Sequence, residues 1–165
     1  MSNDITYGIA GYKAHEFLVD QWIDGNGMKT GPIKLWDLDE TFKVIYCFQS
    51  WCPGCHSRGF PALKEMVEEL KDSDKVKFLA IQTVFEGHDT NTHEKLIETQ
   101  KQYDIKIPFG HDPGDESSNN RSQIMYHYRT GGTPWFIFID QRNNVVFNDF
   151  HLNIKAAIEF LKTQS

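Results

Sequence analysis

Two cysteines three positions apart carry the clearest chemical signal in this sequence. Cys52 and Cys55 flank the dipeptide Pro-Gly, directly after the apolar run 44–48 and directly before a stretch with helical periodicity. A strand that turns into a helix leaves the first thiol at the helix N-terminus, where unpaired backbone N–H groups and the helix dipole favour the thiolate. Because the thiolate is the attacking species in disulfide exchange, this context predicts a redox-active dithiol.

The two sulfurs are expected to act in order. Cys52 would be the nucleophile at the N-cap, with Pro53 at the first helical position, where an N–H would be unpaired anyway. The amides of Gly54 and Cys55 can donate to the Cys52 sulfur. Cys55, one turn into the helix and partly buried, would attack a mixed disulfide at Cys52 and release the reduced partner. The plainer alternative is a pair of reduced helix cysteines with no redox role.

The neighbours of the pair complete the predicted site. Trp51 is expected to cover the dithiol as a packing residue. His56, if protonated, would favour a nearby thiolate, and the alternative is an exposed surface histidine. Thr133-Pro134 follows two glycines and precedes an apolar strand, where a proline can lack its N–H without breaking a ladder. The peptide bond before Pro134 is a candidate cis bond.

Composition narrows the class of protein. The 165 residues, 39% of them hydrophobic, predict a single domain over 1–165. Seventeen Lys and Arg against 23 Asp and Glu give a net charge of −6, which argues against nucleic acid or an anionic membrane as a partner. The N-terminal residues show no export signal, and no apolar run could span a bilayer, so a cytoplasmic protein is predicted. Three cysteines are too few for a disulfide scaffold, and Cys47 is interpreted as a core residue.

Periodicity of the apolar residues predicts the elements that position the dithiol. Three short β-branched and aromatic runs are predicted to be buried strands: 41–48, 75–83 and 135–140. Three helices are predicted from apolar spacing: one that starts at Cys52, one over 93–103 and one around 154–161. Residues 107–110 would form a short edge strand, and the asparagines at 143–144 a hairpin turn. This order mixes a parallel βαβ unit with an antiparallel ββα unit.

The two motifs and this element order resemble the thioredoxin superfamily, and within it the TlpA/ResA-like thiol-disulfide oxidoreductases and their AhpC/TSA-related redoxin relatives. Four segments look like the family's opening segment, its strand before the core, its active-site turn and its cis-proline loop: 14–17, 33–38, 48–55 and 132–134. The resemblance implies an α/β fold of three α/β/α layers, with a mixed central sheet, an inserted αβ segment and an N-terminal extension. It also implies that Cys52 attacks, that Cys55 resolves, and that Thr133 meets the substrate chain through its backbone.

The sequence departs from the family pattern around the dithiol. Pro53-Gly54 replaces the more usual dipeptide ending in proline, and Pro61 lies one residue later than in most relatives. Tyr46 stands where many thioredoxins carry a buried acid that moves the proton of the resolving thiol. Another base is then needed, and Glu86, at the end of the second core strand, is the nearest carboxylate in the predicted topology. A solvated loop glutamate is the alternative.

Three rival functions fit part of the motif. Cys52, Cys55 and His56 match the c-type haem attachment pattern, and a metal carrier could hold a soft ion between the two sulfurs, with a histidine as third ligand. We expect neither a metal nor another cofactor. A peroxiredoxin-like thiol peroxidase would use Cys55, or Cys52, as its peroxidatic thiol. Such enzymes usually carry threonine or serine three residues before that cysteine and proline four before that, whereas Cys52 and Phe48 stand at those positions.

The predicted function is therefore reversible dithiol–disulfide exchange, with the Cys52–Cys55 disulfide as the redox group. The partner would be a protein or small molecule that bears a disulfide or a dithiol, and an electron donor that the sequence does not identify would complete the cycle. In a cytoplasmic setting the expected direction is reduction of the substrate.

Overall fold

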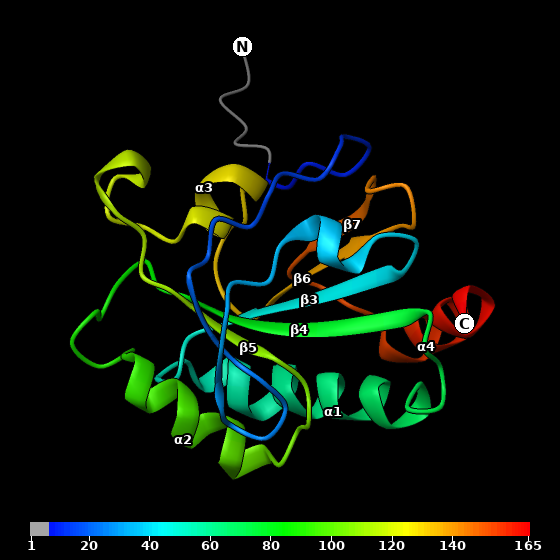
Figure 1. Cartoon of the computed structure of the whole chain (residues 1–165), viewed down its shortest axis with the longest axis horizontal. Coiled ribbons are helices and arrows are strands. Elements are labelled where there is room, and N and C mark those ends of the chain that lie inside the picture. Colours follow the sequence, from blue (N-terminus) through cyan, green and yellow to red (C-terminus); the bar gives the residue numbers. More distant parts are fainter. Residues whose placement is uncertain (1–6) are drawn as a thin grey trace.

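The computed structural model describes residues 7–165, whose seven strands form one sheet in the order β2-β1-β5-β4-β3-β6-β7 (Figure 1). The strands are β1 (Gln21–Ile23), β2 (Lys29–Thr30), β3 (Phe42–Phe48), β4 (Val76–Thr83), β5 (Phe109–Asp112), β6 (Trp135–Ile139) and β7 (Val145–Asp149). The α-helices are α1 (Phe60–Glu69), α2 (His93–Tyr103), α3 (Gln123–Tyr128) and α4 (Ile154–Gln164). Short 3₁₀ turns cover Leu35–Leu38 and Glu116–Ser118, and a π-helical turn covers Cys55–Gly59.

The centre of the sheet is a parallel pair joined by a helix. β3 runs parallel to β4 with α1 between them along the chain, while β6 pairs antiparallel with β3, and β7 with β6. This is the predicted βαβ unit followed by an antiparallel ββα unit, since α4 follows β7. The expected insertion is α2 and β5, which extends the sheet parallel to β4. The β6–β7 hairpin turns at Asn143, whose positive φ of 62° is one that asparagine tolerates.

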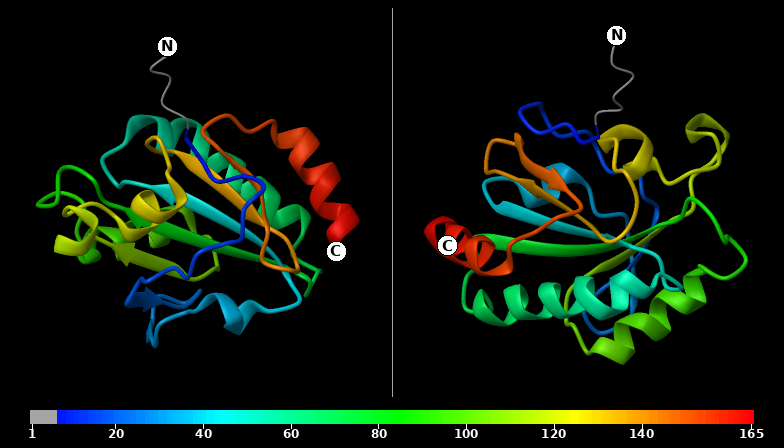
Figure 2. Two further views of the ribbon diagram at one scale, coloured as in Figure 1. Left: turned by 90° about the horizontal axis from the view of Figure 1, so that it is seen from above. Right: turned by 180° about the vertical axis from the view of Figure 1, so that it is seen from behind.

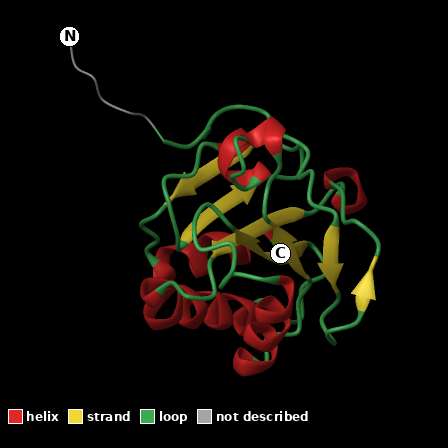
Figure 3. Cartoon of the chain, turned by 90° about the vertical axis from the view of Figure 1, so that its left-hand side faces the viewer, coloured by secondary structure: helices red, strands yellow, loops and turns green. Residues whose placement is uncertain are grey.

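Side chains alternate across β3 and contribute to two cores, one on each face of the sheet. The even-numbered residues of β3 pack with α1, α2 and α4, whereas Ile45 and Cys47 pack with α3 and the N-terminal segment. Figure 2 shows α1 and α2 on one side of the strands and α3 on the other, and Figure 3 shows the longer helices gathered on one side of the sheet. Cys47 is free and buried, and burial raises the pKa of its thiol, as expected for a packing residue. The predicted three-layer α/β fold is confirmed.

The N-terminal extension continues the sheet beyond β5. β1 pairs antiparallel with both β5 and β2, so β5 lies inside the sheet and begins at Phe109. The prediction of an edge strand over 107–110 was wrong because the β1–β2 hairpin is too short to show alternation in the sequence. The strand predicted over 33–38 was also wrong. Leu35–Leu38 is a 3₁₀ turn, since the Asp37 carboxylate accepts the Lys34 N–H at 2.9 Å and closes the chain locally.

None of the helices in 7–165 is both long enough and apolar enough to cross a bilayer. Within this part of the chain, no group of three His, Cys, Asp or Glu side chains is arranged to hold a metal ion. The first six residues, on which the prediction about an export signal partly rests, lie outside the described residues.

Candidate active site

The two sulfurs meet at the junction between β3 and the helix that follows it. β3 ends at Phe48, and the chain turns so that the Cys52 N–H donates to the Gln49 carbonyl at 3.0 Å. Helical backbone begins at Pro53. Cys52 and Cys55 form a disulfide with their Cα atoms 5.3 Å apart. The Cys55 N–H donates to Cys52 Sγ at 3.2 Å, so a helix amide is in place to support negative charge on this sulfur.

The two sulfurs differ in their access to a partner. Cys55 is fully buried, whereas Cys52 keeps 6% of its surface exposed. Cys52 Sγ lies 3.6 Å from the carbonyl oxygen of Thr133. The Thr133–Pro134 peptide bond is cis, and Pro134 lies so close to the turn that a Cβ on Gly54 would be 3.4 Å from its Cδ. An incoming sulfur would therefore meet Cys52 first, beside the backbone of Thr133.

Trp51 and Glu86 are both hydrogen-bonded through their backbones to the side chain of Asn91, in the loop between β4 and α2. Trp51 is 44% exposed, its N–H donates to the Asn91 side chain at 3.1 Å, and its indole nitrogen lies against Gly87. Pro53 is also exposed. Glu86 is exposed, and its backbone carbonyl accepts from Asn91 at 3.2 Å. Its carboxylate has no hydrogen-bonding partner among the described residues, so the structure places Glu86 on the loop without a contact that would orient its carboxylate as a base.

Tyr46, where the resembled family carries an acid, holds the resolving cysteine by its backbone. The Tyr46 hydroxyl donates to the Cys55 carbonyl at 3.0 Å. Burial raises the pKa of this phenol well above its ordinary value. A phenol that stays neutral is a hydrogen-bond donor and does not act as a base near neutral pH. Tyr46 therefore positions Cys55 and cannot replace the missing acid.

The same tyrosine packs where the helix is widened. The Cys55 carbonyl also accepts the N–H of Phe60, five residues on, and Cys55–Gly59 forms a π-helical turn. The ring of Tyr46 fills the space beside Gly59, where an added Cβ would lie 2.7 Å from the ring atom Cζ. A π turn holds one residue more than an α turn. This accounts for the later position of Pro61, which still falls in the first turn of α1.

His56 ties the active-site turn to α2. Its Nε2 contacts the Ser50 carbonyl, and its Nδ1 contacts the Tyr103 hydroxyl. Because a carbonyl can only accept, Nε2 carries a proton, and in the neutral ring Nδ1 accepts from the tyrosine. Both nitrogens of His56 thus have protein partners. In this conformation neither is free to ligate haem, or to serve as the histidine ligand of a metal carrier.

A buried polar network, which the sequence analysis missed, anchors the same turn to the sheet. Gln82 Oε1 accepts from the N–H and the hydroxyl of Ser50, at 3.1 and 2.5 Å. Gln82 Nε2 donates to the Thr92 carbonyl at 3.0 Å and to His111 Nδ1 at 3.1 Å. The sequence signal is a glutamine inside the apolar run that forms β4. Since Ser50 also holds His56, this network fixes the segment that carries Cys52.

The buried histidine of this network makes the fold sensitive to acid. Burial, followed by the nearby His93 and His88, lowers the pKa of His111 from 6.5 to about 4. Between these values the unfolded chain binds a proton that the folded chain does not. The free energy of unfolding therefore falls as the pH drops from 6.5 toward 4, by an amount on the order of 2 kcal/mol from this group.

Urea denaturation near pH 7 and near pH 4.5 measures this dependence. His111→Asn should reduce the loss of stability between the two conditions. His151→Asn, which changes an exposed histidine, should leave it as in the parent. The same loss in all three proteins would show that His111 is not the group responsible.

The fold and the bonded pair define a thioredoxin-like protein, with a Cys-x-x-Cys at the start of the first long helix and a Thr-Pro loop facing it. The family model described as "AhpC/TSA family" matches residues 10–148, and the chain belongs to this family. The resemblance to the thioredoxin superfamily is thereby confirmed, as is the expectation of an oxidoreductase of that class.

Solved structures show the same fold over nearly their whole length. A thioredoxin-like superfamily protein, SPOA0173, is 31% identical with a TM-score of 0.80, and the match covers 93% of this chain and 96% of that chain. A thiol-disulfide isomerase from Corynebacterium glutamicum is 22% identical, with a TM-score of 0.70 and coverage of 95% and 94%. A candidate thiol:disulfide interchange protein DsbE from Chlorobium tepidum is 21% identical, with a TM-score of 0.65 and coverage of 98% and 96%. The last two likenesses establish the fold alone. No curated protein matches the sequence.

Proposed function

We propose that the protein exchanges its Cys52–Cys55 dithiol with the disulfide of a substrate protein. The observation that carries the proposal is the unequal placement of two bonded sulfurs. Cys52 lies at the helix start, with the Cys55 N–H directed at its sulfur and part of its surface exposed. Cys55 is fully buried, and its sulfur is bonded to that of Cys52. Such a pair can attack with one sulfur and resolve with the other.

The exchange transfers two electrons in two steps. The Cys52 thiolate of the reduced protein attacks one sulfur of the substrate disulfide, and the other substrate sulfur leaves as a thiolate and takes up a proton. The Cys55 thiolate then attacks the Cys52 sulfur, the Cys52–Cys55 disulfide forms, and the second substrate thiol is released. An external dithiol or thiol donor must return the two electrons to the protein.

The residues around the pair have separate tasks in this scheme. The Cys55 N–H stabilises charge on Cys52, and the Thr133 carbonyl lies beside the sulfur that the substrate approaches. Tyr46 holds the Cys55 backbone. Glu86 stays a prediction for the base that accepts the Cys55 proton. A cytoplasmic setting, and with it the reductive direction, also stays a prediction.

Trapping the intermediate tests the proposal. A Cys55→Ser variant should stall at the mixed disulfide, because the second attack has lost its nucleophile. Incubation with a disulfide-bonded protein such as insulin should give a covalent adduct, seen on a non-reducing gel and by intact mass and released by dithiothreitol. The double variant Cys52→Ser/Cys55→Ser is the control. An equal yield of adduct with the double variant would contradict the assigned role of Cys52.

A thiol peroxidase is the second candidate, because the AhpC/TSA family match does not separate the two activities. In that case Cys55 would attack a peroxide and become a sulfenic acid, and Cys52 would displace water from it to form the same disulfide. The burial of Cys55 and the absence of threonine or serine at position 52 argue against this route. Rapid consumption of hydrogen peroxide by the reduced protein, with a sulfenic acid trapped at Cys55 in a Cys52→Ala variant, would establish it in place of the first.

A further inference from the structure

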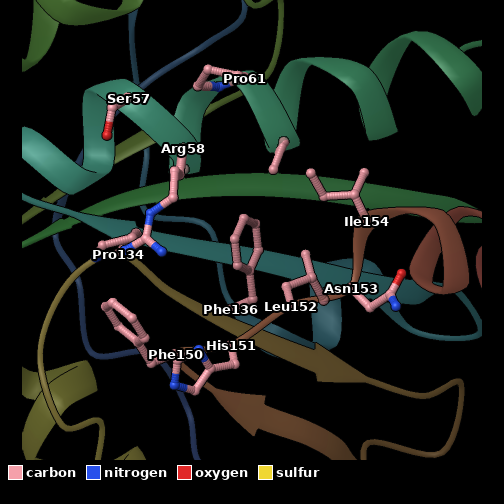
Figure 4. A pocket seen from close by; sticks show the side chains of 12 residues that line it. Ser57, Arg58, Pro61, Pro134, Phe136, Phe150, His151, Leu152, Asn153 and Ile154 are labelled. Atoms are coloured by element: carbon pink, nitrogen blue, oxygen red, sulfur yellow. The ribbon is translucent and has the colours of Figure 1, made fainter.

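A groove of about 630 Å³ begins beside the dithiol and runs along the start of the helix (Figure 4). The mechanism described above does not use it. Its lining includes one cation and several apolar side chains, among them Arg58, Pro134, Phe136, Phe150, Leu152 and Ile154. Because Pro134 also borders the active-site turn, a substrate whose sulfur reaches Cys52 can lay the adjoining part of its chain in this groove.

Arg58 lies at the end of the groove next to the dithiol. Its guanidinium carbon is 5.4 Å from the centre of the Phe150 ring, and its Nη2 would be 3.9 Å from a Cβ on Gly54. In Figure 4 the side chain extends from the helix toward Pro134 and Phe150. Among residues 7–165, no carboxylate oxygen lies within 4 Å of it, since the ion pairs there involve lysines. The guanidinium therefore rests on an aromatic face and has no anionic partner.

The chemistry of this cation indicates what it can bind. A guanidinium over an aromatic ring keeps its N–H groups directed outward in its own plane, where they match the two oxygens of a carboxylate. The molecule carries a net charge of −6, yet no Asp or Glu lines the groove. The nearest acid along the chain, Asp149, lies outside the lining and accepts the His151 N–H at 3.2 Å. The groove is thus an acid-free surface with a cation at its dithiol end.

The far part of the groove is lined mainly by apolar side chains, with Asn153 between two of them. Phe136 is buried at its floor, and Leu152 and Ile154 are half-buried along its side. These surfaces suit an aliphatic or aromatic side chain of the substrate, which would bury them further. A small disulfide without apolar side chains would leave this part of the groove unfilled.

We propose that the groove selects protein disulfides in which an Asp or Glu stands within two or three residues of the reacting cysteine, with an apolar residue beyond it. The carboxylate would pair with Arg58, and the apolar side chain would pack on Phe136 and Leu152. An extended chain advances about 3.3 Å per residue. A substrate whose cysteine sulfur is at Cys52 can therefore place its carboxylate at Arg58 and its next apolar side chain further along the groove. This inference rests on the proposed function and gives its substrate class.

Activated peptides test this selectivity. Each peptide carries a leucine and one cysteine as its 2-pyridyl disulfide, with Glu, Gln or Lys two residues from the cysteine. Attack by Cys52 on the peptide sulfur forms the mixed disulfide and releases pyridine-2-thiol, whose absorbance gives the rate. We expect the reduced parent protein to favour the Glu peptide over the Lys peptide by about tenfold in the second-order rate constant, the scale of one charge-assisted hydrogen bond. Arg58→Glu should reverse this preference, and Arg58→Gln should abolish it.

Lys64→Glu is the matched control. It makes the same change in charge on the same helix, but Lys64 donates to the Tyr103 carbonyl at 3.0 Å and does not line the groove. It should keep the preference of the parent. An unchanged Glu-to-Lys ratio in Arg58→Glu would overturn the inference while leaving disulfide exchange intact. Faster reduction of oxidised glutathione than of any protein disulfide would overturn the choice of a protein substrate, and failure to react with all three peptides would overturn the proposed function itself.

Discussion

Replacing Cys52 by serine is expected to lower turnover of a disulfide substrate by about 10³-fold or more, the scale on which loss of a catalytic nucleophile acts. A serine hydroxyl is not ionised near neutral pH and does not displace a thiolate from sulfur. Cys55 cannot take over, because it is fully buried whereas Cys52 retains exposed surface. Reduction of insulin with dithiothreitol as the electron donor measures the loss.

The control for this prediction is the third cysteine. Cys47→Ala removes a thiol on the opposite face of β3 and should retain turnover. The Cys52→Ser protein should also unfold in urea at the same midpoint as the reduced parent, because the exchange of sulfur for oxygen is nearly isosteric. A tenfold loss of rate corresponds to only about 1.4 kcal/mol of activation free energy. If a folded Cys52→Ser protein kept more than about one tenth of the parent turnover, Cys52 could not be the nucleophile.

The dithiol and the central elements could be predicted because their signals are local. The spacing of Cys52 and Cys55, the apolar run before them and the helical periodicity after them all lie in one continuous segment. Thr133-Pro134 is equally local, since two glycines and an apolar strand flank it. The resemblance to a family then related these two segments, which the structure places with Cys52 Sγ 3.6 Å from the Thr133 carbonyl.

The support beneath the dithiol could not be predicted, because it depends on pairs far apart in the sequence. Ser50 and Gln82 are 32 positions apart and meet only because β3 and β4 are neighbours in the sheet. The Arg58–Phe150 contact likewise needs the loop after β7 to return to the helix. The short β1–β2 hairpin could not be predicted for another reason. Strands of two or three residues show no periodicity, and pairing of β1 with β5 decides their conformation.

Tyr46 shows how one substitution in the family pattern changes the surrounding helix. An acid at this position would be a proton carrier, whereas the tyrosine is larger and stays neutral. Its hydroxyl bonds to the Cys55 carbonyl, its ring requires a glycine at position 59, and the helix widens to a π turn between these two points. The tyrosine, the glycine and the later proline are therefore one structural unit, which connects a sequence departure to the placement of the resolving sulfur.

This unit makes Gly59→Ala the most destabilising single change that we predict, by about 3 kcal/mol or more. The added Cβ would lie 2.7 and 2.8 Å from the Tyr46 ring atoms Cζ and Cε2. The ring cannot withdraw, because Tyr46 is fully buried and packs against Phe48, Phe60 and Phe136. Alanine is favoured over glycine within a helix by only about 0.5–1 kcal/mol, so the clash dominates.

Urea denaturation of Gly59→Ala beside Gly31→Ala measures the effect. A Cβ on Gly31 meets no atom within 4 Å, so that control should stay within about 0.5 kcal/mol of the parent. Tyr46→Phe separates the hydrogen bond from the packing, because it removes only the hydroxyl that donates to the Cys55 carbonyl. We expect it to lower the free energy of unfolding by about 1 kcal/mol. If Gly59→Ala unfolded at the same urea concentration as Gly31→Ala, the ring would not occupy the space at Gly59. The π turn would then need a cause other than Tyr46.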